Sequence, residues 1–174
     1  MRCFVTVGTT QFDELVQAVL SEESCRALKN LGITEVVAQC GRGSYLPPGF
    51  QKKDGSSKEL NGLNVILYKY KNQIQSDMEN SQLIIGHAGA GTCLEALRLS
   101  KPFVGVINCN LMDDHQRELA DRLSSCGCIV ATTPEELHSV LNNFSLNSLK
   151  PFLPSDLTKL SHEIDRIVGL SGSA

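Results

Sequence analysis

Two glycine-containing loops carry the residue types best suited to bind a phosphorylated ligand. One is residues 8–10 (Gly-Thr-Thr), after the apolar segment 3–7, and the other is residues 87–92 (His-Ala-Gly-Ala-Gly-Thr), after segment 83–86. Glycine lets a backbone approach a ligand closely. The N–H groups and the positive dipole end at the start of a following helix favour an anion. The two loops therefore predict a diphosphate site.

Neither loop fits the two commonest nucleotide-binding motifs. No Gly-Lys-Ser/Thr follows either loop, which excludes a Walker loop. A dinucleotide site has G-x-G-x-x-G and an acid at the end of the second strand. Here the second apolar segment, residues 35–39, continues instead as Cys40-Gly41-Arg42-Gly43. A dehydrogenase-like domain that binds NAD is therefore disfavoured.

Simpler structural roles stay open for the same residues. The pattern Thr92-x-x-Glu95 is also that of a capping box, Thr10-x-x-Asp13 is a poorer one, and residues 9–10 are typical helix caps. His87 ends a buried segment, where a structural histidine is as much expected as a ligand-binding one. Residues 115–116, next to two aspartates, fit the exposed first turn of a helix.

Six short apolar segments alternate with helical patterns along the chain. They are residues 3–7, 35–39, 64–68, 83–86, 103–107 and 128–131. They are rich in Val and Ile with little polar alternation, which is typical of strands buried on both faces. The alternation predicts an α/β fold with a parallel, Rossmann-like sheet in the order 3-2-1-4-5-6. In that order, loops 8–10 and 87–92 flank one crevice at the carboxyl ends of the strands.

Local signals predict where some elements begin and end. Thr133, Pro134 and Glu136 read as a cap, a first helical residue and a capping-box acid. Gly127 fits the position just after the preceding helix. Residues 47–62, with Pro-Pro-Gly and Lys-Lys-Asp-Gly-Ser-Ser, predict a solvated loop.

The length of 174 residues corresponds to one domain, which we place at residues 1–150. Residues 151–174 then form a C-terminal helix and tail, with an apolar stripe from Leu157 to Val168. With 41% hydrophobic and 20% charged residues the chain has material for a core. Its net charge of −3 and scattered basic residues disfavour a nucleic-acid binder.

The cysteines and the apolar segments predict a cytoplasmic protein. The seven cysteines are an odd number, and no secretion signal precedes them, which favours a reducing compartment. The most apolar stretch, residues 83–107, contains His87, Glu95, Arg98 and Lys101, so no membrane span is expected.

A longer motif is more specific than its parts, and it resembles the donor-binding half of two-lobed nucleotide-sugar glycosyltransferases. The chain carries it as His87-x-Gly89-x-x-Thr92-x-x-Glu95, followed by His115-Gln116-x-x-Leu119-Ala120. With Val5-Thr-Val-Gly-Thr-Thr10 and Gln39-x-Gly41-Arg42-Gly43, the chain resembles glycosyltransferase family 28 over nearly all of residues 2–170. Within that family it is most similar to the cytosolic subunits of the N-acetylglucosaminyltransferase of asparagine-linked glycosylation.

The resemblance implies a fold equivalent to the C-terminal, donor-binding lobe of a two-lobed GT-B enzyme. It places Glu95 on the ribose hydroxyls of UDP, and the 87–92 loop on the diphosphate. Gln116 and His115 would contact the sugar, although His115 replaces an acid of the wider pattern and Leu119 an Asn. The full set of implied donor-binding residues is Gly8, Thr9, Thr10, Gln39, Gly41, Arg42, His87, Gly89, Ala90, Gly91, Thr92, Glu95, His115 and Gln116.

The resemblance also implies a reaction. N-acetylglucosamine (GlcNAc) would be transferred from UDP-GlcNAc to GlcNAc-diphosphodolichol, as the second sugar, in β-1,4 linkage and with inversion. The acceptor 4-hydroxyl displaces UDP. The base that takes its proton is not identified by the sequence: the candidates are His87, His115 and a group on a partner subunit. No D-x-D motif is present, so neither a metal nor another cofactor is expected.

The chain has about half the length that a two-lobed transferase needs. In the resembled family the acceptor lobe is a separate, membrane-anchored subunit, which implies recruitment to the cytosolic face of the endoplasmic reticulum. Residues 151–174 would either dock on that partner or pack on the chain's own sheet. The alternatives are a non-catalytic UDP-sugar-binding regulatory module and a stand-alone glycosyltransferase acting on a soluble acceptor.

Overall fold

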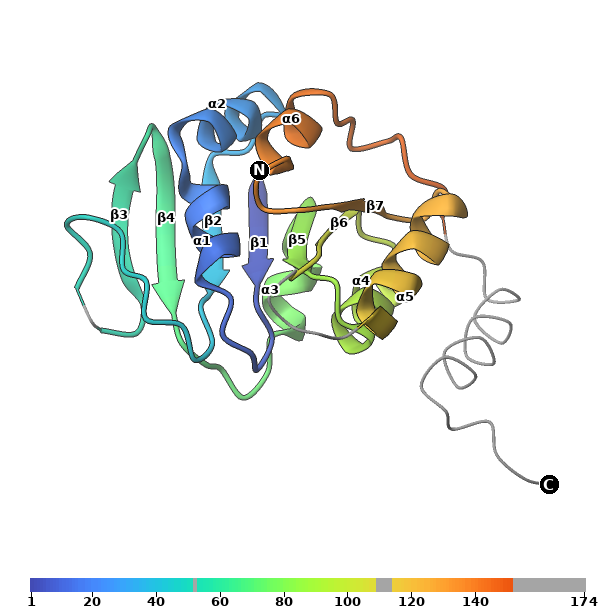
Figure 1. Cartoon of the computed structure of the whole chain (residues 1–174). Coiled ribbons are helices and arrows are strands. Elements are labelled where there is room, and N and C mark those ends of the chain that lie inside the picture. Colours follow the sequence, from blue (N-terminus) through green and yellow to red (C-terminus); the bar gives the residue numbers. More distant parts are fainter. Residues whose placement is uncertain (52, 109–113, 152–174) are drawn as a thin grey trace.

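The computed structural model describes residues 1–51, 53–108 and 114–151, with the backbone alone for residues 114–116. Strands and helices alternate along the chain, as the sequence predicts (Figure 1). The strands are β1 (Arg2–Thr6), β2 (Glu35–Gln39), β3 (Ser56–Leu60), β4 (Leu63–Tyr68), β5 (Leu83–His87), β6 (Phe103–Val106) and β7 (Val130–Thr132). The helices are α1 (Asp13–Leu20), α2 (Glu22–Asn30), α3 (Gln75–Glu79), α4 (Ala90–Arg98), α5 (Asp114–Ser125) and α6 (Leu137–Asn142).

The strands of the described residues form one sheet in the order β3-β4-β2-β1-β5-β6-β7. Neighbouring strands are parallel except for β3 and β4. With β3 set aside, this is the predicted order 3-2-1-4-5-6, which is confirmed. Because β1 lies between β2 and β5, the strand order reverses there, and a crevice is expected at the carboxyl ends of these three strands.

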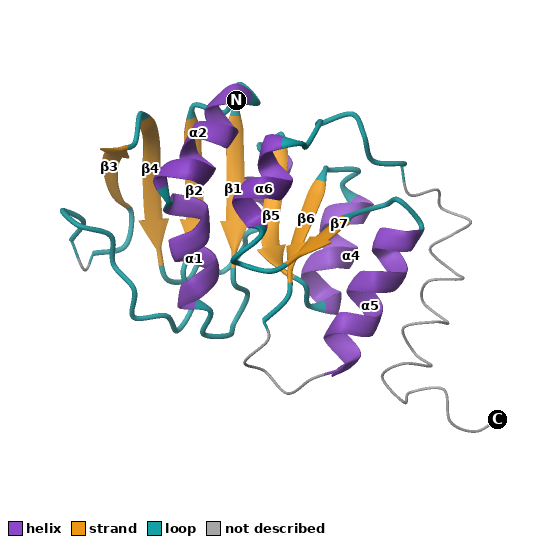
Figure 2. Ribbon diagram, turned by 45° about the horizontal axis from the view of Figure 1, so that its top comes forward, coloured by secondary structure: helices purple, strands orange, loops and turns teal. Residues whose placement is uncertain are grey.

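Helices cover both faces of the sheet (Figures 1 and 2). Helices α1, α2 and α6 pack on one face, together with alternate strand residues such as Cys3 and Val5. Helices α3, α4 and α5 pack on the other face, together with residues such as Phe4 and Ile84. Consecutive residues of one strand are therefore buried in different cores. This explains why the strands lack polar alternation.

The polar segment 47–62, predicted to be a loop, contains strand β3, so that prediction is wrong in part. β3 pairs antiparallel with β4 at the edge of the sheet. Asn61 and Gly62 join the two strands, and both have positive φ angles, 52° and 79°. An Asn-Gly pair in this conformation is a strong hairpin signal. Because Ser57, Lys58 and Glu59 are exposed, the strand reads as solvated although its backbone belongs to the sheet.

The predicted end of α5 is confirmed. Gly127 has φ +74° and its N–H donates to the carbonyl of Ser124, while the Cys128 N–H donates to that of Leu123. This is a Schellman motif, which ends the helix. It occupies residues that were assigned to the last strand, so β7 begins at Val130 rather than at residue 128.

The predicted start of α6 is wrong by three residues. The helix begins at Leu137, after Glu136, and no side chain caps it. Thr133 contacts Glu135 rather than Glu136, and this hydrogen bond lowers the pKa of Glu135. Residues 134–136 form a turn before the helix.

Helices α2 and α3 were not predicted from the sequence. The predicted stripe 157–168 lies outside the described residues. In the part of the chain that the structure describes, no helix is long and apolar enough to cross a membrane.

Candidate functional site

The loops that follow β1, β2 and β5 meet at one edge of the sheet, because the three strands are parallel neighbours. This is the lower edge in Figure 1. A side-chain Cβ placed on Gly8, after β1, would lie 3.8 Å from Nδ1 of His87, the last residue of β5. The structure therefore brings together the two loops that the sequence singled out.

A chain of hydrogen bonds ties the loop after β1 to the end of the neighbouring strand β2. The Thr6 hydroxyl donates to Oε1 of Gln39 over 2.5 Å, and it accepts from the N–H of Gly8 over 3.0 Å. The Thr10 hydroxyl donates to the carbonyl of Val7 over 2.8 Å. Gln39 is 5% exposed, and its hydrogen bond with Thr6 supports the loop from within the protein. Thr9 is exposed at the tip.

Two expected capping roles in this loop are absent. α1 begins at Asp13 with Phe12 before it, and no side chain caps it. Neither Thr9 nor Thr10 therefore caps α1, and Thr10 does not form a capping box with Asp13. Both threonines instead belong to the loop at the carboxyl edge.

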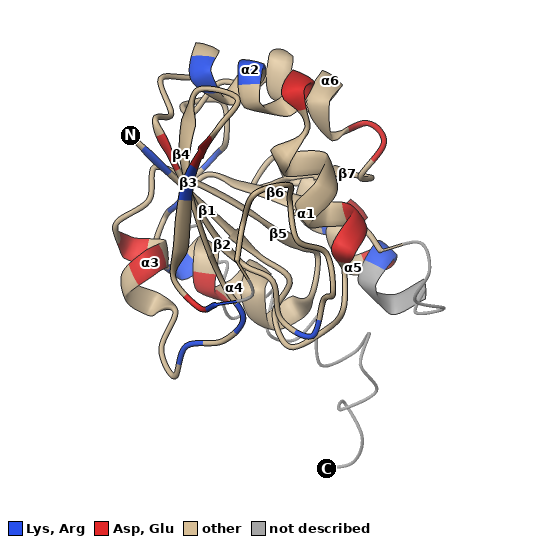
Figure 3. Cartoon of the chain, turned by 90° about the vertical axis from the view of Figure 1, so that its left-hand side faces the viewer, with Lys and Arg blue, Asp and Glu red and all other residues tan. Residues whose placement is uncertain are grey.

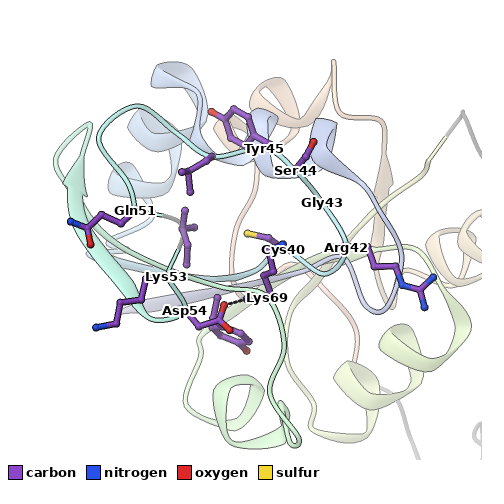
Figure 4. A pocket seen from close by; sticks show the side chains of 12 residues that line it. Cys40, Arg42, Gly43, Ser44, Tyr45, Gln51, Lys53, Asp54 and Lys69 are labelled. Atoms are coloured by element: carbon purple, nitrogen blue, oxygen red, sulfur yellow. Dashed lines mark hydrogen bonds between the residues drawn. The ribbon is translucent and has the colours of Figure 1, made fainter.

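The Gly41-Arg42-Gly43 segment packs backbone against backbone on the loop after β1. The Arg42 N–H donates to the carbonyl of Thr10 over 3.2 Å. A Cβ on Gly41 would lie 2.6 Å from that same carbonyl oxygen, and one on Gly43 would collide with the Asp13 carboxylate. Arg42 is exposed, and Figure 4 shows its side chain directed away from Gln51 and Lys53.

Asp13 positions this segment, a role that the sequence did not reveal. Its carboxylate accepts from the N–H and hydroxyl of Ser44, each over 3.0 Å, and from the N–H of Tyr45 over 3.1 Å. Burial raises the pKa of Asp13, but these hydrogen bonds more than offset it, so the pKa lies below 3.8. No local spacing could have paired residues that lie about 30 positions apart.

A cavity of about 390 Å³ lies beside this segment, at the carboxyl ends of β2 and β4 (Figure 4). Lys and Arg residues occur along this rim, seen from the side in Figure 3. They include Arg42, Lys53 and Lys69. Burial raises the pKa of Cys40, which lines the cavity, to about 11, so its thiol stays neutral.

The loop after β5 leads into α4 without a side-chain cap. Gly89 precedes the helix, and its Cα packs on the imidazole of His87, where a Cβ would collide with the ring. His87 is 7% exposed. A Cβ on Gly91 would meet nothing within 4 Å. The first amides of α4 have no acceptor within the helix, so this end is suited to hold an anion.

Thr92 and Glu95 do not form a capping box, the alternative role that the sequence allowed. Because Gly89 is the N-cap, Thr92 is the third residue of α4 and Glu95 lies in its second turn. The Thr92 methyl group packs closely on Gly86 of β5. Burial raises the pKa of the neighbouring Cys93 to about 12, so this thiol is neutral as well.

Glu95 is exposed and lines a cavity of about 420 Å³ between α4 and the connection from β4 to α3. The opposite wall consists of Asn72, Gln73, Ile74 and Gln75, with Met78. Carboxylate, amide and apolar groups together can hold a ring that carries hydroxyl and amide functions. This wall could not be predicted from the sequence, because its residues follow no recognisable motif.

Residues at the carboxyl end of β6 complete the edge. Asn108, two residues after β6, is 6% exposed and is a further candidate that sequence reasoning missed. The only sequence feature that could have indicated it is its position as an amide side chain directly after the apolar segment 103–107. His115 and Gln116 belong to the first turn of α5, and their side chains lie outside the described structure. Among the described side chains, no group of three His, Cys, Asp or Glu residues is placed to hold a metal ion.

Known proteins resemble this chain in sequence. The family model "Glycosyltransferase family 28 C-terminal domain" matches residues 2–166. "UDP-N-acetylglucosamine transferase subunit ALG13" of Saccharomyces cerevisiae is 33% identical over 175 residues, which cover 86% of this chain and 87% of the yeast protein. The Homo sapiens protein of that name is 42% identical over 147 residues, or 80% of this chain and 12% of the human protein. The chain thus spans about an eighth of the human and Mus musculus relatives.

Solved structures resemble it in fold. The NMR solution structure of ALG13 aligns with a TM-score of 0.70 and 30% identity, over 94% of both chains. MurG of Acinetobacter baumannii aligns with a TM-score of 0.57 and 18% identity, over 97% of this chain and 49% of MurG, a likeness of fold alone. The fold is that of the C-terminal, Rossmann-like lobe of GT-B glycosyltransferases. By sequence and by fold, the chain belongs to glycosyltransferase family 28, as a C-terminal domain of that family.

Proposed function

We propose that this chain binds UDP-GlcNAc and is the donor-binding subunit of a heteromeric N-acetylglucosaminyltransferase. The observation that carries the proposal is that the uncapped start of α4 and the Gly8 loop meet at the reversal of strand order, with the Glu95 cavity further along the same helix. Relatives that share this part of the chain are named UDP-N-acetylglucosamine transferase subunits, which supports the choice of sugar.

The donor would lie along the carboxyl edge of the sheet. The diphosphate takes the first amides of α4 and the positive end of the helix dipole, with Gly91 leaving space for it. The Glu95 carboxylate accepts from the two ribose hydroxyls. The uracil ring then enters the cavity against residues 72–75. His115 and Gln116, at the start of α5, would take the sugar hydroxyls.

The transfer would be a direct displacement. The oxygen of the acceptor 4-hydroxyl attacks the anomeric carbon, and the bond from that carbon to the diphosphate oxygen breaks with inversion. The electron pair leaves with UDP, where helix α4 stabilises the growing charge without an obligatory metal. The hydroxyl proton passes to a base, for which His87 and His115 are the candidates. Because His87 packs between Gly8 and Gly89, its position favours contact with the diphosphate.

The acceptor, GlcNAc-diphosphodolichol, would be held by a separate membrane-anchored subunit at the cytosolic face of the endoplasmic reticulum. The product would carry a second GlcNAc in β-1,4 linkage. Residues 151–174 are our proposed docking segment for that subunit. Orientation of an acceptor is worth on the order of 7–11 kcal/mol of barrier, so the chain alone should bind donor without appreciable turnover.

A binding titration tests the donor site. The chain is titrated with UDP-GlcNAc, UDP-glucose and NAD, and the titration is repeated with Glu95→Gln. Glu59→Gln is a matched control, since Glu59 is exposed on β3. We expect Glu95→Gln to weaken UDP-GlcNAc binding at least tenfold, or about 1.4 kcal/mol, and Glu59→Gln to leave it unchanged. Binding of NAD in place of UDP-sugars would contradict the proposal, and UDP binding without preference for the sugar would favour a regulatory module.

Activity assays test the need for a partner. The purified chain is given UDP-GlcNAc and a lipid-linked GlcNAc diphosphate, with and without membranes that carry the second subunit. We expect product only with the membranes, and the same rate in the presence of EDTA. Full turnover by the purified chain on a soluble acceptor would instead identify a stand-alone glycosyltransferase.

A further inference from the structure

Three side chains tie the connection between β4 and α3 to both of its ends, and we call Tyr68, Lys71 and Asp77 the clamp. The Tyr68 hydroxyl donates to Oδ2 of Asp77 over 2.7 Å. The Lys71 ammonium donates to the same oxygen, also over 2.7 Å. That ammonium lies 4.3 Å from the centroid of the Tyr68 ring. The last residue of β4, the middle of the connection and α3 are thereby joined.

The Tyr68–Asp77 half of the clamp is shielded from water, whereas its Lys71 half is partly exposed. Tyr68 is 4% exposed and the Asp77 side chain 12% exposed, while Lys71 reaches in from the surface with 46% of its side chain exposed. Burial raises the pKa of the Tyr68 phenol, and Asp77 raises it further, so the hydroxyl stays protonated and donates. The partly buried hydrogen bond from Tyr68 to the Asp77 carboxylate is therefore stronger than one at an open surface.

The segment that the clamp holds is one wall of the Glu95 cavity. Residues 72–75 directly follow Lys71, and Met78 directly follows Asp77; both line that cavity opposite α4. The carbonyl of Lys69, just before the held segment, accepts from the N–H of Gly41 over 3.2 Å. The clamp therefore joins the two ends of the segment that lines the cavity with Glu95.

We propose that Tyr68, Lys71 and Asp77 are positioning residues for the nucleoside end of the bound donor. The inference rests on the proposed function, since it takes the Glu95 cavity as the nucleoside site. The loop for the diphosphate has other supports, among them the hydrogen bond from the Ala88 N–H to the carbonyl of Val106 over 3.0 Å. Loss of the clamp should therefore weaken nucleoside recognition and spare diphosphate recognition.

The test separates the two halves of the ligand. Tyr68→Phe removes one donor and keeps the ring, and Tyr70→Phe is the matched control, because Tyr70 lies two residues further on and is 45% exposed. Isotope-labelled chains are titrated with UDP and with inorganic pyrophosphate, and binding is followed by NMR. We expect Tyr68→Phe to weaken UDP roughly three- to tenfold, as loss of one net hydrogen bond implies, with pyrophosphate unchanged. Tyr70→Phe should change neither.

A second pair of variants covers the ionic half of the clamp. Lys71→Met should weaken the binding of UDP but not that of pyrophosphate. Lys71→Arg keeps a cationic donor and should bind UDP like wild type. Lys58→Met, on the edge strand, should have no effect on either ligand. Equal weakening of both ligands, at matched thermal stability, would show a merely structural role and overturn the inference. If wild type binds UDP and all variants match it, the clamp alone is wrong. If wild type fails to bind UDP, the proposed function falls, and the inference with it.

Discussion

The loops after β2 and after β5 both contain glycines of the implied donor site, but the glycines differ in what surrounds them. Gly41, after β2, is buried, has φ +56°, and has no room for a Cβ, which would lie 2.6 Å from the Thr10 carbonyl oxygen and 2.7 Å from Cγ2 of Val7. Gly91, in the first turn of α4, is exposed, and a Cβ there would meet nothing within 4 Å.

A glycine can therefore contribute to a site in two ways. Gly41 lets two backbones meet and so builds one wall of the crevice, where a side chain is excluded by the protein itself. Gly91 leaves open space in front of uncapped amides, where a side chain would be excluded only by a ligand. Substitution by alanine distinguishes the two, because the first should cost stability and the second should cost affinity.

The largest effect is expected from Gly41→Ala. The new methyl group meets backbone atoms that cannot swing aside, and the residue must hold a left-handed conformation. Overpacking and the left-handed penalty together predict a loss of about 2–4 kcal/mol in the free energy of unfolding. Urea denaturation of the variant and wild type measures it. An unchanged midpoint and slope would mean that the backbone contact between the two loops carries no strain.

The opposite pattern is expected from Gly91→Ala. In the first turn of a helix, alanine should raise the free energy of unfolding by about 0.5–1 kcal/mol. The methyl group would enter the space proposed for the diphosphate and weaken UDP about tenfold, or about 1.4 kcal/mol. Urea denaturation and a UDP titration measure the two quantities. Full UDP affinity in this variant would remove Gly91 from the proposed site.

Much of the fold could be predicted because burial on both faces leaves a local signature. Apolar runs such as residues 3–7 and 35–39 mark central strands, and a parallel sheet then has few ways to wind. The same reasoning brought the Gly8 and His87 loops together correctly. It missed β3, because an edge strand has a solvated face, and it misplaced the start of α6, because Thr133 bonds to Glu135 and not to Glu136.

The supports of the site could not be predicted, since their partners are distant in sequence or follow no motif. Gln39 was assigned to the ligand from its motif, and its described hydrogen bond is to Thr6. Asp13 read as a weak capping acid, yet it holds Ser44 and Tyr45. The residue types at the carboxyl edge were therefore foreseeable, whereas the division between ligand contacts and supports depends on the folded geometry.

The smallest effect that still bears on the comparison is expected from Asp13→Asn. Its carboxylate ties the loop after β2 to α1, so a neutral amide should lose about 1 kcal/mol of stability at pH 7, given partial exposure. The pKa of Asp13 is lowered in the folded chain from its ordinary value of 3.8. The negative charge of Asp13 therefore stabilises the fold fully at pH values above 3.8. That contribution is lost as the pH falls through the lower folded value.

Wild type and variant should therefore differ most at neutral pH and converge in acid. Urea denaturation at pH 7, pH 5 and pH 3 measures the difference, with Glu59→Gln as a control for the loss of one exposed negative charge. A constant difference at all three pH values would mean that the hydrogen-bond geometry, and not the charge, holds the loop. No difference at pH 7 would leave the packing of Gly41 as the main support of this wall, and would deepen the contrast with Gly91.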